Sequence, residues 1–118
     1  MKAISIRQPW AHLVVAGIKT IENRHWSTNY RGVVLIHASV NRDRDAHHDL
    51  RRLRLRVPDE LVRGALIGYA ELVDVITESP DKFFWGPFGF VLRNAQALKK
   101  PIPLIGRSKL FDVSSITL

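Results

Sequence analysis

The chain has 118 residues, which is enough for one domain with a buried core. A hydrophobic fraction of 46% and a charged fraction of 25% are ordinary for a globular domain, and the absence of cysteine excludes disulfides, a thiol nucleophile and thiolate metal ligands. Eighteen basic residues against eleven acidic ones give a net charge of +7.

The first part of the chain predicts a strand, a helix and a second strand. Residues 2–7 alternate in polarity, which is typical of a strand. Residues 9–17 predict a helix, because Pro9 suits a first helical turn and Gly17 suits a helix end. Residues 20–26 alternate again. The side chains that form the helical stripe are Trp10, Leu13, Val14 and Gly17.

The middle of the chain predicts a strand, a helix and a long strand. Residues 33–40 are strongly apolar, with His37 and Ser39 on one face of the expected strand. Residues 41–56 predict a second helix that ends before Pro58, because proline cannot continue it. Residues 64–77 predict a long strand, bent or bulged near Gly68. The buried stripe of the second helix would be Ala46, Leu50, Leu53 and Val57.

The last part predicts a loop over residues 79–87 and a strand over 88–92. Two or three short strands should follow between Leu98 and Leu118, separated by Pro101 and Pro103. Many short strands with two or more flanking helices indicate an α+β fold, a small mixed β-barrel. Because no repeat, low-complexity tract or linker interrupts the pattern, we expect a single domain over residues 1–118.

The positive charge is unevenly distributed. Residues 1–31 and 93–118 each hold five basic residues against one acidic, and residues 42–63 hold seven against five, whereas residues 64–92 hold one against four. If the two ends of the chain meet in a barrel, their charge forms one surface that attracts polyanions. Such clustering favours a nucleic-acid partner over a charge that serves only solubility.

No apolar stretch is long enough to span a membrane, and charges interrupt the apolar stretches near the N-terminus, against a signal peptide. We therefore expect a cytoplasmic location and no membrane partner. The adjacent His47 and His48 point to different sides of their helix, so we expect no metal site, and we expect no cofactor. The oligomeric state stays open.

The most informative segment joins the first helix to the second strand. Residues 17–24 read Gly-x-Lys-x-x-Glu-x-Arg, which places Lys19 at the junction. On the following strand, Glu22, Arg24 and Trp26 project from the same side. Charged side chains whose directions are set by the backbone in this way are typical of a binding site for a polar ligand.

This spacing resembles the signature of the ASCH domain family, which belongs to the PUA-like superfamily of small β-barrel modules, best known for binding RNA. Further resemblance lies in Ser5-Ile6-Arg7-Gln8-Pro9-Trp10, in Tyr30-Arg31-Gly32, in Ile36-His37-Ala38-Ser39 and in the segment from Gly86 to Leu92. The resemblance covers most of the chain and implies a PUA-like barrel with a ligand cleft at the motif.

Within such a cleft, the Lys19 ammonium could neutralise a phosphate or polarise a carbonyl, or act as a base or nucleophile if desolvated. Its alternative role is a surface ion pair with Glu22. Glu22 and Arg24 form either a structural salt bridge or a site in which Glu22 accepts from a base or removes a proton while Arg24 holds a phosphate. The sequence leaves both roles open.

Four further residues complete the candidate site. Trp26, on the Glu22 and Arg24 face, is the candidate for stacking on a base. Arg7 lies in the segment before the motif, and Ser39 resembles a family position near the cleft; both are candidate ligand-binding residues. Glu71 is a tentative catalytic residue, because it could correspond to a distant glutamate of the family's amidohydrolases.

Two functions of different classes follow. The first is a binding module whose cleft holds RNA or a nucleotide. The second is a hydrolase, because the resemblance also extends to ribonucleases and to an amidohydrolase of acetylated cytidine, with Lys19 catalytic. That amidohydrolase uses a threonine three positions after the lysine, where this chain has Glu22.

Overall fold

The computed structural model describes residues 1–114. In this range the chain forms the elements of a small α+β barrel, as the sequence predicts. In chain order they are β1 (Lys2–Ile6), α1 (Trp10–Val15), β2 (Ile21–Arg24), β3 (Gly32–Ala38), α2 (Ala46–Arg52), β4 (Ala65–Ile76), β5 (Phe88–Pro103) and β6 (Leu110–Asp112). No helix among these residues is long and apolar enough to cross a membrane.

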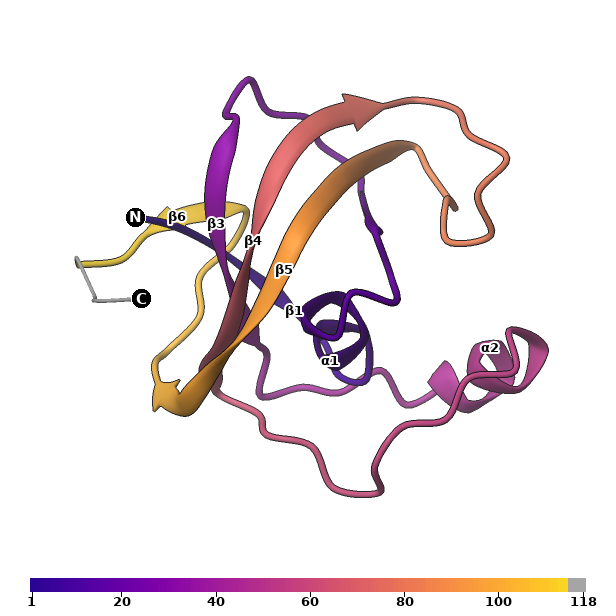
Figure 1. Ribbon diagram of the computed structural model, residues 1–118, viewed down its shortest axis with the longest axis horizontal. Coiled ribbons are helices and arrows are strands. Elements are labelled where there is room, and N and C mark those ends of the chain that lie inside the picture. The colour runs from indigo at the N-terminus through magenta and orange to yellow at the C-terminus, as the bar shows by residue number, and fades with distance from the viewer. Residues whose placement is uncertain (115–118) are drawn as a thin grey trace.

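The strands form one mixed sheet in the order β2-β5-β4-β3-β1-β6, in which β1 and β3 are parallel and the other pairs antiparallel. The sheet curls so strongly that it forms an incomplete barrel (Figure 1). Register shifts along the β4–β5 pairing, one of them between Leu66 and Gly68, supply the curvature, since bulges bend a strand and increase its twist. They confirm the irregularity predicted near Gly68.

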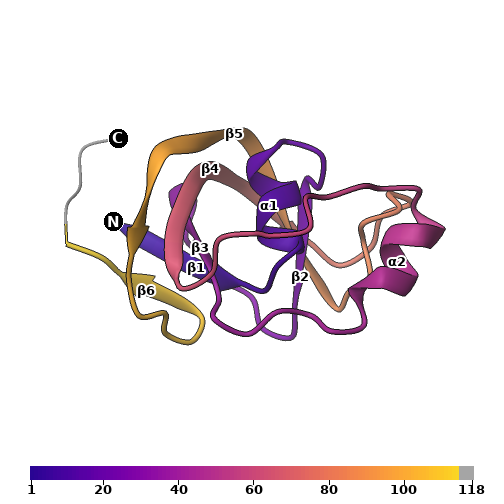
Figure 2. The same ribbon diagram turned by 90° about the horizontal axis from the view of Figure 1, so that it is seen from below.

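Helix α1 packs inside the curled sheet, where it contacts β1, β3, β4 and β5 (Figures 1 and 2). Its Trp10, Leu13 and Val14 are buried in the main core, as their spacing predicts. Gly68 permits this packing, because a Cβ there would lie 2.7 Å from a methyl carbon of Val15 and would overlap a β5 carbonyl. The helix thus fills one side of the barrel interior.

The two basic ends of the described chain meet, which is the condition under which their charge forms one surface. β1 pairs with β6, and the Met1 ammonium donates to the Val113 carbonyl at 2.8 Å. Lys2 and Asp112 form a 2.9 Å ion pair across the same strands. Residues 1–7 and the segment around β6 therefore share one face of the molecule.

The predicted helix over residues 41–56 is much shorter in the structure. α2 begins only at Ala46, because hydrogen bonds hold the preceding residues as a loop: Asp43 N–H donates to the Gln8 carbonyl at 2.8 Å, and Trp10 Nε1–H donates to Asp43 Oδ2 at 2.9 Å. The helix ends at Arg52, six residues before Pro58, and Arg54 follows with a positive φ of 57°. Proline is not what ends this helix.

The prediction of separate short strands between Leu98 and Leu118 is confirmed by β6 but wrong for residues 98–103. β5 continues from Phe88 to Pro103 as one strand, with Asn94 at a positive φ of 55°. β2 pairs only with residues 88–91 of β5, so the later residues have a free edge. Prolines are tolerated on such an edge, because no neighbouring strand needs their missing N–H. Residues 115–118, at the end of the predicted strand region, lie outside the described residues.

Candidate functional site

The turn after α1 places Lys19. Gly17, with a φ of +78°, donates to the Val14 carbonyl at 3.0 Å, and Ile18 donates to the Leu13 carbonyl at 3.0 Å. These two bonds form a Schellman motif, which confirms Gly17 as the helix end. The Lys19 N–H donates to the same Leu13 carbonyl at 3.0 Å, so the chain turns back toward the barrel at this point. Lys19 is consequently only 1% exposed and is one of the largest fully buried side chains among residues 1–114.

The charged side chains of the motif form a continuous ion chain, Lys19–Glu22–Arg24. Lys19 Nζ donates to Glu22 Oε1 at 2.7 Å and also to the Ile21 carbonyl. Arg24 donates to Glu22 Oε2 from Nε at 3.1 Å and from Nη2 at 2.9 Å. Arg24 Nη2 also donates to the Ser5 carbonyl of β1 at 2.6 Å. Because β2 is one end of the sheet and β1 lies next to the other, Arg24 bridges the open side of the barrel.

The ion chain fixes the charge of Glu22. Burial alone would raise the pKa of this carboxyl, but the charges of Lys19 and Arg24 and their hydrogen bonds outweigh burial and hold the pKa below its ordinary value of 4.5. Glu22 is therefore ionised at neutral pH. Both carboxylate oxygens are engaged, which suits a structural role better than the acceptance of a proton.

A cleft of about 400 Å³ opens beside the ion chain, and we call it the motif cleft. It brings together five of the predicted site residues, Arg7, Lys19, Glu22, Arg24 and Trp26. All three tryptophans of the chain lie in its wall. The complete lining is Ser5, Ile6, Arg7, Trp10, Lys19, Glu22, Asn23, Arg24, His25, Trp26, Asp43 and Trp85.

Trp85 is the most exposed of the three tryptophans in the cleft. It is 45% exposed, whereas Trp10 is 6% exposed and Trp26 is half-buried with its ring edge-on to Phe90 at 5.0 Å. Trp85 packs edge-on against Trp10 at 5.3 Å, and Lys19 Nζ lies 5.7 Å from its ring centroid, a cation–π arrangement. Trp85 is not among the ligand-binding residues that the sequence predicts. Its position in a loop rich in aromatic, glycine and proline residues was nevertheless a signal that could have indicated such a role.

The motif itself holds the Trp85 loop in place through Asn23. The Asn23 side chain donates to the Phe83 carbonyl at 2.9 Å and accepts from the N–H groups of Trp85 at 2.7 Å and Gly86 at 3.0 Å. Asn23 lies between Glu22 and Arg24 on β2, and alternation along the strand directs it away from the ion chain. The same short strand thus carries the ion chain and positions the aromatic wall.

Two predicted residues lie elsewhere. Ser39 is not in the motif cleft but lines a separate hollow of about 1160 Å³ near β6, which we call the loop hollow. Glu71 is exposed on β4, opposite Arg93 of β5, and lines neither cavity. The bulges near Gly68 change which face each β4 side chain takes, and this facing could not be read from the sequence.

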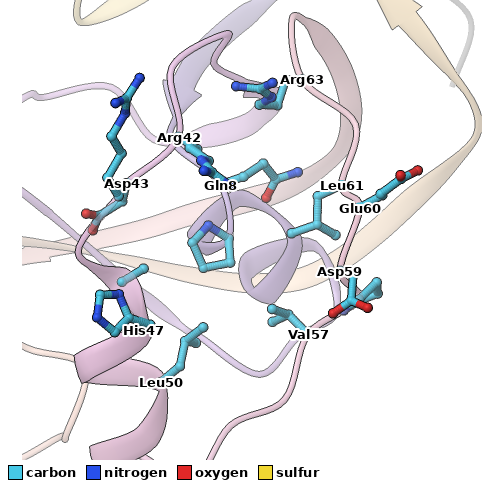
Figure 3. Close-up of a pocket in the computed structure, with 14 residues that line it drawn as sticks. Gln8, Arg42, Asp43, His47, Leu50, Val57, Asp59, Glu60, Leu61 and Arg63 are labelled. Atoms are coloured by element: carbon cyan, nitrogen blue, oxygen red, sulfur yellow. The ribbon is translucent and has the colours of Figure 1, made fainter.

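A third hollow, of about 660 Å³, lies between α2 and residues 57–63. Figure 3 shows the guanidinium groups of Arg42 and Arg63 on one side of it and the carboxylates of Asp59 and Glu60 on another. Charges of both signs line this hollow, so it offers no net attraction for an anion. Among residues 1–114, no three His, Asp or Glu side chains lie close enough together to hold a metal ion.

Comparison with known proteins identifies relatives of this architecture. The sequence model of the ASCH domain family matches residues 4–84. Two proteins named Activating signal cointegrator 1, from Homo sapiens and Mus musculus, are 28% and 29% identical to the chain over 128 aligned residues. Each alignment covers 95% of this chain but 22% of the relative, so the chain spans about a fifth of the length of these proteins.

Solved structures of the same family share the fold. An ASCH protein from Zymomonas mobilis superimposes with a TM-score of 0.54 at 21% identity, covering 87% of this chain and 73% of that one. A point mutant of the same protein gives 0.53 at 21% identity, covering 87% and 75%. At this identity the likeness establishes the architecture, the small mixed barrel expected from the sequence, and nothing about chemistry.

Proposed function

We propose that this chain, which belongs to the ASCH domain family, binds RNA or a single nucleotide in the motif cleft. One observation carries the proposal: a cleft of about 400 Å³ combines an exposed aromatic face with arginine side chains, in a protein of net charge +7. The volume falls within the range of about 300–1,000 Å³ that is usual for small-molecule sites. The human and mouse relatives are named as cointegrators of an activating signal, which is compatible with a regulatory role.

The cleft supplies both types of contact that an unpaired nucleotide needs. Trp85 offers a ring face on which a base can stack, since it is 45% exposed. Arg7 is exposed at the rim and forms no ion pair with any residue in the described range. Arg24 uses Nε and Nη2 in bonds within the protein, and its Nη1 has no hydrogen-bond partner among residues 1–114. Both arginines are suited to contact a phosphate.

The ion chain serves this function as a framework. Lys19 is 1% exposed and its ammonium is bonded to Glu22 and to the Ile21 carbonyl. A hydrolase would need the Lys19 ammonium or the Glu22 carboxylate to reach the substrate, and both are engaged. This geometry favours binding over hydrolysis.

Affinity for a labelled single-stranded RNA, measured by fluorescence anisotropy at low salt, tests the proposal. Trp85→Ala should weaken binding by about 1–3 kcal/mol, the typical contribution of one stacked base, while Trp85→Phe should retain most of the affinity. Arg7→Ala should weaken binding and lower the salt dependence by about one phosphate contact. Arg56→Ala, which also removes an exposed charge but outside the cleft, is the matched control. Equal affinities for all four variants would reject the cleft as the binding site.

A turnover assay tests the framework role. Labelled RNA and acetylcytidine should both remain intact after incubation with the protein. If either substrate is consumed, and Lys19→Met abolishes turnover while circular dichroism shows an intact fold, then the site is catalytic and the framework role of Lys19 is wrong.

A further inference from the structure

The loop between β5 and β6, residues 104–109, forms the wall of a second cavity next to the motif cleft. The loop hollow of about 1160 Å³ lies behind this loop, and Ser5 of β1 lines both the hollow and the cleft. β6 pairs with β1 only as far as Ile4, so β6 leaves β1 unpaired at Ser5, the residue that the two linings share. The cleft and the loop hollow therefore lie on either side of Ser5.

The chemistry of the hollow suits a nucleotide. Leu66, Ile102, Leu104 and Phe111 give it an apolar wall, and the hydroxyls of Ser39 and Ser108 give it donors and acceptors for a ribose. Ser39, which the sequence singled out as a ligand-binding candidate, thereby has a place in the same binding surface.

Charge distinguishes this hollow from the one beside α2. Arg107, which lines the hollow, is exposed and forms no ion pair with any residue in the range 1–114. Asp112, the acid in the lining, is paired with Lys2 at 2.9 Å. The hollow beside α2 also adjoins the cleft, at Asp43, but its carboxylates balance its arginines. A phosphate next to the cleft is therefore attracted toward Arg107.

A buried hydrogen-bond relay holds the loop against β1. His37, 1% exposed, lies 2.6 Å through Nε2 from the Leu104 carbonyl and 2.8 Å through Nδ1 from Ser5 Oγ. Because a carbonyl only accepts, Nε2 carries the proton, and in the neutral ring Nδ1 accepts from the Ser5 hydroxyl. Gly106 sits directly on this relay: a Cβ there would lie 2.7 Å from the His37 ring and would overlap Ser5 Oγ. The loop is thus preorganised before any ligand binds.

From these observations we infer that the loop hollow is a second subsite, which holds the nucleotide adjacent to the one in the motif cleft, with Arg107 contacting the phosphate between them. This inference rests on the proposed function and specifies it further. The natural ligand would be a single strand of at least two nucleotides, not a free mononucleotide.

Quenching of intrinsic tryptophan fluorescence measures both ligands, because all three tryptophans line the motif cleft. The probes are an equimolar mixture of the four nucleoside 5′-monophosphates and a trinucleotide RNA pool of random sequence. The trinucleotide pool should bind more tightly than the monophosphates. Arg107→Ala should weaken trinucleotide binding by about tenfold and reduce its salt slope by about one phosphate contact. Monophosphate affinity should stay unchanged, and Arg56→Ala should change neither.

A second variant tests the position of the loop without changing charge. Gly106→Ala should displace the loop from Ser5 and weaken the trinucleotide selectively, provided that its unfolding transition shows a folded protein. If the trinucleotide binds no more tightly than the monophosphates, or if Arg107→Ala behaves like Arg56→Ala, the second subsite is overturned while the motif cleft stands. If neither probe quenches the tryptophans, the proposed function itself fails, and the subsite with it.

Discussion

At the scale of single residues, the buried pair of Lys19 and Glu22 dominates the site. Glu22→Gln leaves the Lys19 ammonium buried without a carboxylate, and removing one partner of a buried ion pair typically costs about 3–5 kcal/mol. We expect a loss of about 3 kcal/mol in the free energy of unfolding, measured with urea, because the glutamine oxygen retains one hydrogen bond. Glu71→Gln, at an exposed glutamate, should stay within about 0.5 kcal/mol of wild type. Equal losses in the two variants would contradict the framework role.

The same carboxylate predicts how stability responds to acid. The pKa of Glu22 is lower in the folded protein than its ordinary value of 4.5, so its contribution is complete above pH 4.5 and is lost as the pH falls through the folded pKa. The pKa of the exposed Asp112 is also lowered, chiefly by its hydrogen bond to Lys2, so the wild-type profile contains both groups. The difference between the wild-type and Glu22→Gln profiles isolates Glu22. This difference in the free energy of unfolding should shrink below pH 4.5. A difference that stays constant with pH would show that Glu22 does not cause the loss of stability in acid.

At the scale of elements, the turn at Gly17 determines where the motif strand begins. A Cβ at this position would meet nothing within 4 Å, so a substitution is penalised only through the φ of +78°. Gly17→Ala should therefore destabilise the protein by about 1 kcal/mol, and Gly17→Asn by less, because asparagine tolerates the left-handed region. Thermal unfolding of the two variants beside wild type measures the order. An alanine variant as stable as wild type would mean that the turn relaxes and does not position Lys19.

Local patterns predicted α1 and β2 because residues close along the chain determine both elements. An apolar stripe and a terminal glycine define α1, and an alternation of side chains defines β2. They did not predict the short α2, because its start depends on Trp10 and Gln8, more than thirty residues away, which bond Asp43 into a loop. Local patterns also failed to predict the length of β5. A proline interrupts a central strand, but an edge strand such as the later part of β5 continues through it. Which strand is at an edge depends on the whole sheet.

At the scale of the whole molecule, the predicted residues that lie together in the motif cleft are mostly close along the chain. The ion chain spans six positions, so its charged side chains could be placed on one side of a short strand. Trp85 and Asp43 reach the cleft through tertiary contacts, and nothing in the sequence fixes those contacts. For the same reason the sequence predicted Ser39 in the motif cleft, whereas it lines the loop hollow. The β1 strand separates these two cavities, and the sequence cannot distinguish them.

The positive charge of the molecule supports RNA binding, because the basic segments at its two ends adjoin the cleft and the loop hollow. A salt titration of RNA affinity, followed through the three cleft tryptophans, tests the central claim most directly. Random single-stranded RNA should quench their fluorescence at low salt, and the logarithm of the affinity should fall linearly with the logarithm of salt concentration, by about 0.7 for each phosphate contacted. Unquenched tryptophans at low salt, or an affinity independent of salt, would contradict the proposal that this cleft binds RNA.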